Sequence, residues 1–304
     1  MNGILVIDKP TGLTSHDVVN RVRRILHERS VGHLGTLDPL ATGVLPLVVG
    51  NLTRLAQFYT SSEKEYEGVI RFGFATDTYD AEGDPTGAAT QVQVSLEEIN
   101  SISRQFIGLI QQLPPPFSAK KIHGVPAYKL ARKQKAVTLQ PVQVEVKEFE
   151  ILRAEGDRAI FRARVSSGTY MRSVAHDMGQ LLGCGAHLES LRRPAVAEFS
   201  LGDAHTLDAL EAAVQHGPIE ELFIHPRKIL PQFPSVTATE EMAARIRSGQ
   251  TVNLPELSKA RLVKVFVGQR SLIAIATRVA GTLFHAGIVL AGDPARQTAK
   301  SAIS

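Results

Sequence analysis

Two neighbouring segments in which apolar and polar residues alternate place the strongest constraint on the fold. The run VQVEVKEFEILRA (142–154) is followed by EGD and then by RAIFRARVSS (158–167). Alternation with a period of two is typical of half-buried strands, and a short Gly-containing segment between two such strands predicts a hairpin. The segment EYEGVIRFGFAT (65–76) alternates in the same way and predicts a further strand. The chain therefore has to contain antiparallel sheet.

Two other segments have the apolar spacing of amphipathic helices. Thr14 stands at capping-box spacing from Asp17 and opens a predicted helix through about His27. Thr169 can cap a second helix, whose apolar stripe leaves out Arg172 in the first turn. A cation there is disfavoured by the helix dipole by ~0.3–1 kcal/mol, so Arg172 is either a solvent-exposed side chain or a functional one. The segment NLTRLAQFYTSS (51–62) predicts another helix, capped by Asn51. Strands and helices together predict a mixed α and β fold.

Prolines divide the chain into two predicted units. Pro226, Pro231 and Pro234 mark a linker, so we expect a large domain over residues 1–233 and a small one over 234–304. The strand patterns LVKVFV, SLIAIATRV and TLFHAGIVL fill the small unit, and we expect the tail DPARQTAKSAIS to be disordered.

The composition of the 304 residues is that of a globular protein, with 43% hydrophobic and 21% charged residues. No apolar run reaches the ~18 residues that a membrane span requires. The start MNGILVIDKPTG lacks the pattern of a signal peptide. Cys184 is the single cysteine, which excludes an internal disulfide and fits a reducing compartment. We therefore expect a cytoplasmic protein that has no membrane partner.

The distribution of charge is more informative than the net charge of +4. No acid occurs between Glu98 and Glu145, and that interval holds aromatic residues among basic ones, including Lys120, Lys121 and Arg132. Basic side chains with interleaved aromatics suit phosphate contacts and base stacking. An ordinary solvated surface, the alternative, usually mixes both signs of charge. We favour a surface that faces nucleic acid.

One carboxylate stands alone in the stretch GHLGTLDPLATGVLP (32–46). Pro39 holds Asp38 in extended geometry, and glycines on both sides permit turns. The nearest other acids are Glu28 and Glu63, so no second carboxylate shares the local segment. From these residues alone, a turn in which the Asp38 side chain bonds its own backbone is somewhat favoured over a reactive carboxylate.

Several motifs of catalytic chemistry are absent from the sequence. It has no HExxH, CxxC, GxxxxGK[ST], GxGxxG or GxSxG pattern, and its ten histidines are scattered. We therefore expect neither a metal nor a cofactor. An RNA-acting enzyme that needs neither is compatible with these residues, and so is a non-catalytic RNA-folding chaperone.

The same stretch, GHLGTLDPLATGVLP, resembles the signature loop of the pseudouridine synthases in their TruB branch, the bacterial tRNA pseudouridine-55 synthases. GILVIDKPTGLTSHDVV, EKEYEGVIRFGFATDTYDAEG, LPPPFSAKKIHGVPAYKLAR and SSGTYMRSVAHDMGQLLGCGAHLESLRR are similar to further motifs of that branch, in the expected order. The C-terminal part is loosely similar to a PUA-type RNA-binding domain. Leu34, Thr36 and Pro194 depart from the family pattern, so local packing of the loop and the strand beside Leu191 are expected to differ.

The resemblance implies an α/β (α+β) fold of the pseudouridine synthase type. It would have a mixed, mostly antiparallel central sheet in a catalytic domain, residues 1–233, followed by a small β-rich PUA-like domain. It also implies that Asp38 is the catalytic aspartate. Arg172 would pair with Asp38 and stabilise its ionised form, and Tyr66 would lie against the flipped uracil and assist proton removal at C5.

Other site residues are implied in the same way. His33 would stack in the RNA loop where nucleotides have flipped out, and Tyr170 and Leu191 would line the uridine pocket. Lys9 would support the active-site loop or contact RNA. The basic residues Lys120, Lys121 and Arg132 would contact phosphates. Without the family motif, a cross-strand aromatic residue of a sheet is the preferred interpretation of Tyr66, and ordinary core packing is a strong alternative for Leu191.

The expected activity is isomerisation of uridine 55 to pseudouridine in the T-loop of tRNA, by a monomer without guide RNA. Asp38 would act either as a nucleophile or by abstracting a ribose proton to give a glycal, and the sequence does not choose between them. A guide-RNA-directed synthase and an RNA chaperone are the alternatives.

Overall fold

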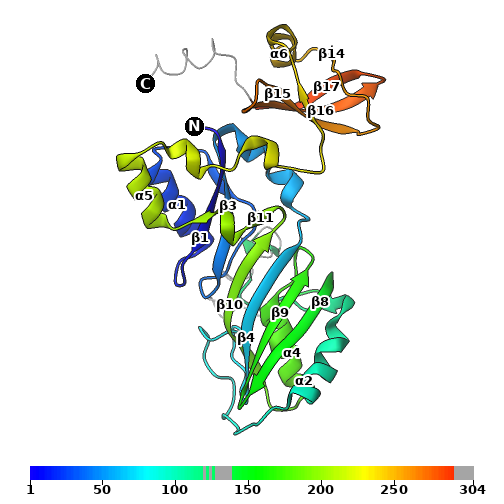
Figure 1. The fold of residues 1–304 in the computed structure, drawn as a ribbon. Helices are drawn as coiled ribbons and strands as arrows, with labels where there is room; N and C mark the ends of the chain where they lie inside the picture. Colours follow the sequence, from blue (N-terminus) through cyan, green and yellow to red (C-terminus); the bar gives the residue numbers. More distant parts are fainter. Residues whose placement is uncertain (119–120, 123–124, 127–138, 291–304) are drawn as a thin grey trace.

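The structure, a computed structural model, describes residues 1–118, 121–122, 125–126 and 139–290. Its main element is a ten-stranded sheet in the order β12-β1-β3-β10-β4-β9-β8-β5, with β2 on β3 and β11 on β10 (Figure 1). The strands are β1 (Gly3–Lys9), β2 (Val31–His33), β3 (Thr42–Val49), β4 (Lys64–Phe72), β5 (Gly108–Gln112), β8 (Val142–Glu155), β9 (Arg158–Val165), β10 (Ala186–Val196), β11 (Phe199–Ser200) and β12 (Ala204–His205).

The sheet is mixed and mostly antiparallel, as expected. Among its strand pairs, β1 with β12 and β3 with β10 are parallel, and the others run antiparallel. The predicted hairpin is confirmed, because β8 and β9 pair from Glu155 and Arg158 outward and Gly156 turns with φ +59°. Pro194 lies inside β10 at a register shift between Arg192 and Ala195, where a residue without an N–H fits the sheet.

The helices cover the sheet in two places. In Figure 1, α2 and α4 lie against the β4–β9–β8 half, whereas α1 and α5 lie beside β1. The helices are α1 (Ser15–Ile25), α2 (Leu96–Ser103), α4 (Met171–Leu181), α5 (Leu207–His216) and α6 (Glu240–Arg247), with 3₁₀ turns η1 (Gly50–Tyr59), η2 (Arg104–Phe106), η3 (Leu201–Asp203), η4 (Ile219–Leu222) and η5 (Pro226–Lys228).

Local signals account for the start of one helix and fail for two other segments. The capping box predicted for Thr14 and Asp17 is present at the start of α1. At α4 the predicted cap is wrong, because the N-cap residue is Tyr170 without a side-chain cap and the Thr169 Oγ1 has no hydrogen-bond partner among the described residues. The segment after β3 was expected to be a helix capped by Asn51, but it is the 3₁₀ turn η1 and has no side-chain cap. The Asn51 amide instead donates to the carbonyl of Leu290 at 2.7 Å, a long-range contact that local sequence does not announce.

The C-terminal residues form a second sheet with a core of its own. Its order is β13-β15-β16-β17-β14, and α6 packs on it. The strands are β13 (Ser235–Thr237), β14 (Val252–Asn253), β15 (Leu262–Val267), β16 (Ser271–Ala280) and β17 (Leu283–Val289). A separate β-rich C-terminal unit was expected, and this sheet is that unit. The boundary at 233/234 stays a prediction, and the tail expected to be disordered lies outside the described residues.

The two sheets share an apolar cluster that contains Ile4 and Val44 of the large sheet and Phe266 and Ile275 of the small one. Next to it, Lys264 is 2% exposed and donates to the carbonyl of Ile229 at 2.6 Å. The small sheet is therefore packed directly against one end of the large one (Figure 1).

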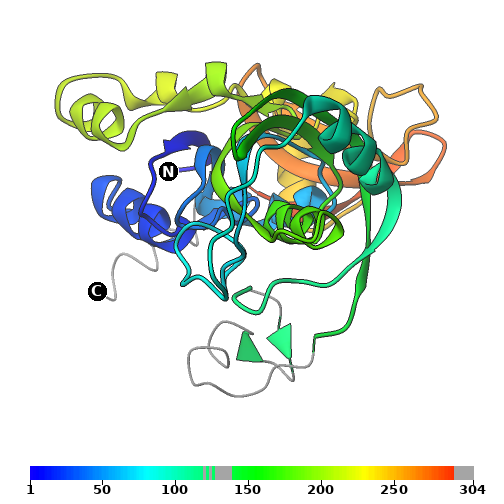
Figure 2. The same cartoon turned by 90° about the horizontal axis from the view of Figure 1, so that it is seen from below.

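Two further features complete the fold. The short strands β6 (Lys121–Ile122) and β7 (Val125–Pro126) pair with each other and stand apart from the large sheet (Figure 2). Within the described ranges, no helix is long and apolar enough to cross a membrane.

Candidate active site

The loop between β2 and β3, residues 34–41, carries Asp38 and is held by side chains that bind its backbone. Arg193 of β10 is fully buried, and its guanidinium donates to the carbonyls of Val44 at 2.8 Å, Gly35 at 3.0 Å and Thr36 at 3.2 Å. On the other side of the loop, the Ser15 hydroxyl donates to the Leu37 carbonyl at 3.0 Å and accepts from the Leu37 N–H at 2.8 Å. The conformation of the loop is therefore set by groups outside it.

Lys9 at the end of β1 gives the loop a third support. Its amine is buried and donates to the carbonyls of Leu13 at 2.6 Å, Pro10 at 2.8 Å and Pro39 at 3.2 Å. Burial lowers the pKa of this amine to about 8, because the charged form loses hydration. Of the two roles expected for Lys9, this position favours support of the loop over direct contact with RNA.

Asp38 and Arg172 lie together, although they are far apart in the sequence. The Arg172 Nε is 2.9 Å from an Asp38 carboxylate oxygen, and the side chains are 5% and 35% exposed. The Nε–H is not aligned with that oxygen, so the contact is an ion pair without hydrogen-bond geometry. Within the described residues, the Asp38 carboxylate makes no hydrogen bond to its own loop. The geometry therefore favours a carboxylate presented outward over the turn interpretation.

The rest of the Arg172 guanidinium is fixed from the segment that follows β4 and from Phe117. It donates to the carbonyls of Thr78 and Phe117, each at 3.1 Å, and Nη1 is 3.4 Å from Asp80 Oδ2. Asp80 is 3% exposed, and its other oxygen accepts from the Thr78 hydroxyl at 2.6 Å. One guanidinium thus links an accessible carboxylate to a buried one.

Asp80 was missed by the sequence analysis, which gave it no role. Several acids follow one another in TDTYDAEGDPTG, and nothing in their order distinguishes the one that is buried. Arg193 was missed for a similar reason, because it adjoins Arg192 and only the strand geometry decides which of the two points inward. Arg192 forms an ion pair with Asp8 at 2.8 Å and is half-exposed.

Three of the expected pocket residues lie on β4, on β10 and just before α4. Tyr66 of β4 and Leu191 of β10 are 7% and 8% exposed and share one apolar cluster with Leu37 of the loop. Tyr170 is the residue before α4, where its N–H donates to the Gln112 amide oxygen at 2.8 Å and its carbonyl accepts from the Gln112 amide at 3.1 Å. Burial raises the pKa of the Tyr170 hydroxyl.

His33 ends β2 immediately before the loop. Its Nδ1 accepts a hydrogen bond from the Gly35 N–H at 3.3 Å. Burial lowers the pKa of the imidazole, and the nearby charge of Arg193 lowers it further. A neutral ring at the entrance to the loop suits stacking on a nucleobase.

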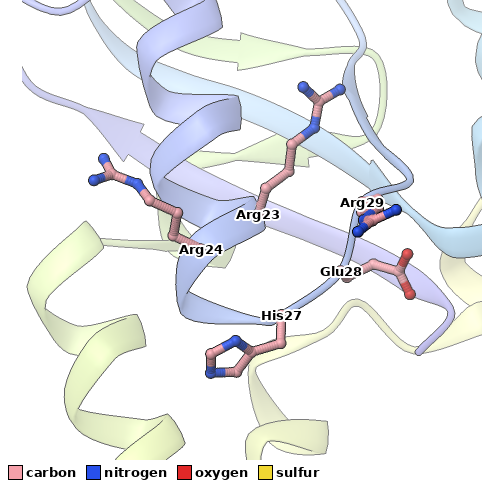
Figure 3. A pocket seen from close by; sticks show the side chains of 5 residues that line it. All are labelled: Arg23, Arg24, His27, Glu28 and Arg29. Carbon is pink, nitrogen blue, oxygen red and sulfur yellow. The ribbon is translucent and has the colours of Figure 1, made fainter. Parts of the chain in front are cut away.

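The expected basic surface falls largely outside the described residues. Lys120 and Arg132 lie outside them, and only the backbone of Lys121, in β6, is described. A different hollow, of about 410 Å³, lies at the C-terminal end of α1 and is lined by Arg23, Arg24, His27, Glu28 and Arg29 (Figure 3). It contains none of the expected site residues, and cations at a helix C-terminus are favoured by the helix dipole.

The arrangement around Asp38 can supply one accessible carboxylate beside a fixed cation. Within the part of the chain that the structure describes, no group of three His, Cys, Asp or Glu side chains is placed to hold a metal ion. Beside the Arg172 guanidinium, which stabilises its negative charge, the Asp38 carboxylate can act as a nucleophile or as a base.

Comparisons with known proteins cover most of the chain. The family model of the N-terminal domain of TruB family pseudouridylate synthases matches residues 23–171, and that of the tRNA pseudouridylate synthase B C-terminal domain matches residues 172–228. A tRNA pseudouridine synthase B of Solibacter usitatus is 49% identical over 95% of this chain and 100% of its own length. Another, of Geotalea uraniireducens, is 40% identical over 91% of each chain.

The fold is also found in solved structures. A chain in the crystal structure of a Cbf5–Nop10–Gar1 complex has a TM-score of 0.68 and 25% sequence identity to this one. The match covers 95% of this chain and 85% of that chain, so it includes both sheets.

Proposed function

Because this chain belongs to the TruB family of tRNA pseudouridine synthases, we propose that it converts uridine 55 in the T-loop of tRNA to pseudouridine, with Asp38 acting on the flipped nucleotide. The observation that carries the assignment of Asp38 is its ion pair with the buried Arg172 at 2.9 Å. A half-exposed carboxylate that is oriented by a fixed guanidinium is available to substrate and is not consumed by its own loop.

The reaction breaks the glycosidic bond, turns the base and rejoins it through C5. The Asp38 carboxylate starts this sequence either by attacking as a nucleophile or by removing a ribose proton. In both cases it has to be ionised, and Arg172 stabilises that form. Tyr66, which lies in the apolar cluster beside the loop, is proposed to lie against the uracil and to assist the loss of the C5 proton.

Access to C1′ and C5 requires the uridine to leave its stack, at a cost of a few kcal/mol. We propose that Tyr170 and Leu191 line the pocket that receives it and that His33 stacks in the space it leaves. Phosphate contacts from Lys120, Lys121 and Arg132 would offset part of the cost. Lys9 would act indirectly, through the loop backbone that its amine binds.

The proposal assigns residues 1–233 to catalysis and residues 234–304 to a PUA-like RNA-binding unit. We further propose that this protein needs no guide RNA. Support comes from the relatives named tRNA pseudouridine synthase B, which match nearly the full chain at 40–49% identity. The Cbf5 chain belongs to a complex with other proteins, and its likeness to this chain supports the fold.

The test is tritium release from C5-labelled uridine in an unmodified tRNA transcript, without added metal or guide RNA. We expect release by the wild type at a mapped uridine 55 and a loss of at least about 10³-fold for Asp38→Asn. Asp208→Asn, which removes an exposed carboxylate (87% exposed) on α5, is the matched control and should react as the wild type does.

Each alternative gives a different result in that assay. Equal release by wild type and Asp38→Asn would show that Asp38 is a turn residue without a catalytic role. Absence of release until a guide RNA is added would indicate the guide-directed synthase. Tight tRNA binding without release under either condition would indicate the chaperone.

A further inference from the structure

The residue before Asp80 has an unusual backbone conformation. Tyr79 has φ +66°, in the left-handed region that aromatic residues rarely adopt. Such a conformation costs roughly 1–2 kcal/mol, so surrounding contacts must hold it. Two hydrogen bonds account for part of this, since the Tyr79 carbonyl accepts from the Leu188 N–H at 3.0 Å and the Asp80 carbonyl accepts from the Thr76 hydroxyl at 2.6 Å.

The side chain of Tyr79 supplies a further contact. Its ring stacks on the imidazole of His176, with 3.8 Å between the ring centroids and 13° between the planes. Burial lowers the pKa of His176 and raises that of Tyr79, so both rings are held in their neutral forms. The His176 Nδ1 is buried without a hydrogen-bond partner among the described residues, so no hydrogen bond at this atom fixes the ring in addition to the stack.

His176 belongs to the same helix face as Arg172. The two residues are four positions apart on α4, so their side chains lie one turn above the other. Arg172 binds the Thr78 carbonyl and the Asp80 carboxylate, which flank Tyr79 on either side. Helix α4 therefore contacts three consecutive residues, 78–80, of the segment that follows β4, and the stack on Tyr79 is the middle contact.

We propose that Tyr79 and His176 are a positioning pair for pseudouridine formation: their stack sets Asp80 against Arg172 and so directs Arg172 toward Asp38. The inference rests on the proposed role of Asp38. The stack joins the pair to the segment that Arg172 binds through Thr78 and Asp80, so we expect the pair to act through Arg172. A shift of about 1 Å in a positioned group can lower a rate by about 10²-fold, which makes a stack of this kind consequential.

The experiment compares Tyr79→Ala, His176→Ala, their double variant and Tyr79→Phe in single-turnover pseudouridylation of a tRNA transcript. Dissociation constants for tRNA and thermal melting are measured in parallel. We expect each alanine variant to lose about 10- to 100-fold in the single-turnover rate constant while its tRNA affinity stays within about two-fold. The double variant should be no slower than the slower single variant, because the two rings act as one unit. Tyr79→Phe keeps the stack and should retain the wild-type rate.

Tyr79→Gly removes the stack without adding backbone strain. It therefore tests the inference even where the alanine variants misfold. Glycine accepts φ +66° without cost but removes the ring, so we expect the same slow rate in a well-folded protein. A wild-type rate in Tyr79→Gly or His176→Ala would overturn the inference, as would equal impairment of Tyr79→Phe. Asp38→Asn run beside them separates the two proposals. If it is inactive while Tyr79→Gly is fully active, only the positioning pair fails; if it is active, the role of Asp38 fails.

Discussion

Two buried arginines contact the Asp38 loop, one through the loop backbone and one through the Asp38 carboxylate, and their partners differ in kind. Among the residues that the structure describes, Arg193 binds backbone carbonyls and no carboxylate. Arg172 has the carboxylates of Asp38 and Asp80 within 4 Å and also binds two backbone carbonyls. Carbonyls can fix the shape of a loop, but only a charged partner lets the guanidinium stabilise a reacting carboxylate. The comparison therefore separates a cation that holds the fold from one that serves the chemistry.

The largest effect is expected on the reaction rate when Arg172 is changed. Arg172→Lys keeps the charge but has a single ammonium in place of a planar guanidinium, so it cannot reach both carboxylates and both carbonyls. We expect the single-turnover rate constant to fall by about 10²–10³-fold, with tRNA affinity little changed. A variant that reacts at the wild-type rate would show that Arg172 is a fold residue like Arg193.

When Arg193 is changed, we expect the free energy of unfolding to change more than the reaction rate. Arg193→Met fills similar space but leaves the carbonyls of Gly35, Thr36 and Val44 without this donor. Each such buried group costs about 1–3 kcal/mol, partly offset because a charge is no longer buried. We expect the free energy of unfolding to fall by about 2–4 kcal/mol, measured by denaturant titration. A larger loss of rate than in Arg172→Lys, in the folded protein, would show that Arg193 also serves the reaction.

Lys9 allows a pH test of the same region. Its pKa is lowered from 10.5 to about 8 in the folded protein, so between those values the unfolded chain binds more protons and stability rises with pH. The free energy of unfolding of the wild type minus that of Lys9→Met should therefore increase from pH 8 to pH 10, by about 1–3 kcal/mol. Lys64, whose pKa is also about 8, cancels in this difference. A flat difference would mean that the buried amine keeps its proton.

The smallest effect is expected for an exposed arginine with carboxylate partners. Arg21 of α1 pairs with Asp208 at 2.7 Å and Glu211 at 3.2 Å on α5, and all three side chains are more than a third exposed. Arg21→Ala should change the free energy of unfolding by less than about 1 kcal/mol and leave the rate unchanged. This variant tests whether burial, and not the kind of partner alone, makes Arg172 important.

Local patterns predicted the elements but not the contacts between them. The β8–β9 hairpin and the capping box of α1 follow from neighbouring residues, and both were predicted correctly. The conspicuous placement of Asp38 and Arg172 came from the same kind of pattern, but their pairing was only implied by resemblance to a family. Asp80 and Arg193 gave no signal, because their burial depends on how β10 and the segment after β4 pack in three dimensions. The prediction that Asn51 caps a helix was wrong for the same reason, because its side-chain amide binds the distant Leu290 carbonyl.

The way the Asp38 loop is held has a consequence for how its sequence can drift during evolution. The supports contact backbone carbonyl and N–H groups, which every residue type except proline has. Thr36 offers Arg193 only its carbonyl, while its side chain is exposed. Leu34, by contrast, places its side chain in the apolar cluster shared by the two sheets. Substitutions at position 36 should therefore be nearly neutral across homologues, whereas position 34 should change only together with its packing neighbours. Departures from the usual loop sequence can accumulate here without moving the carboxylate.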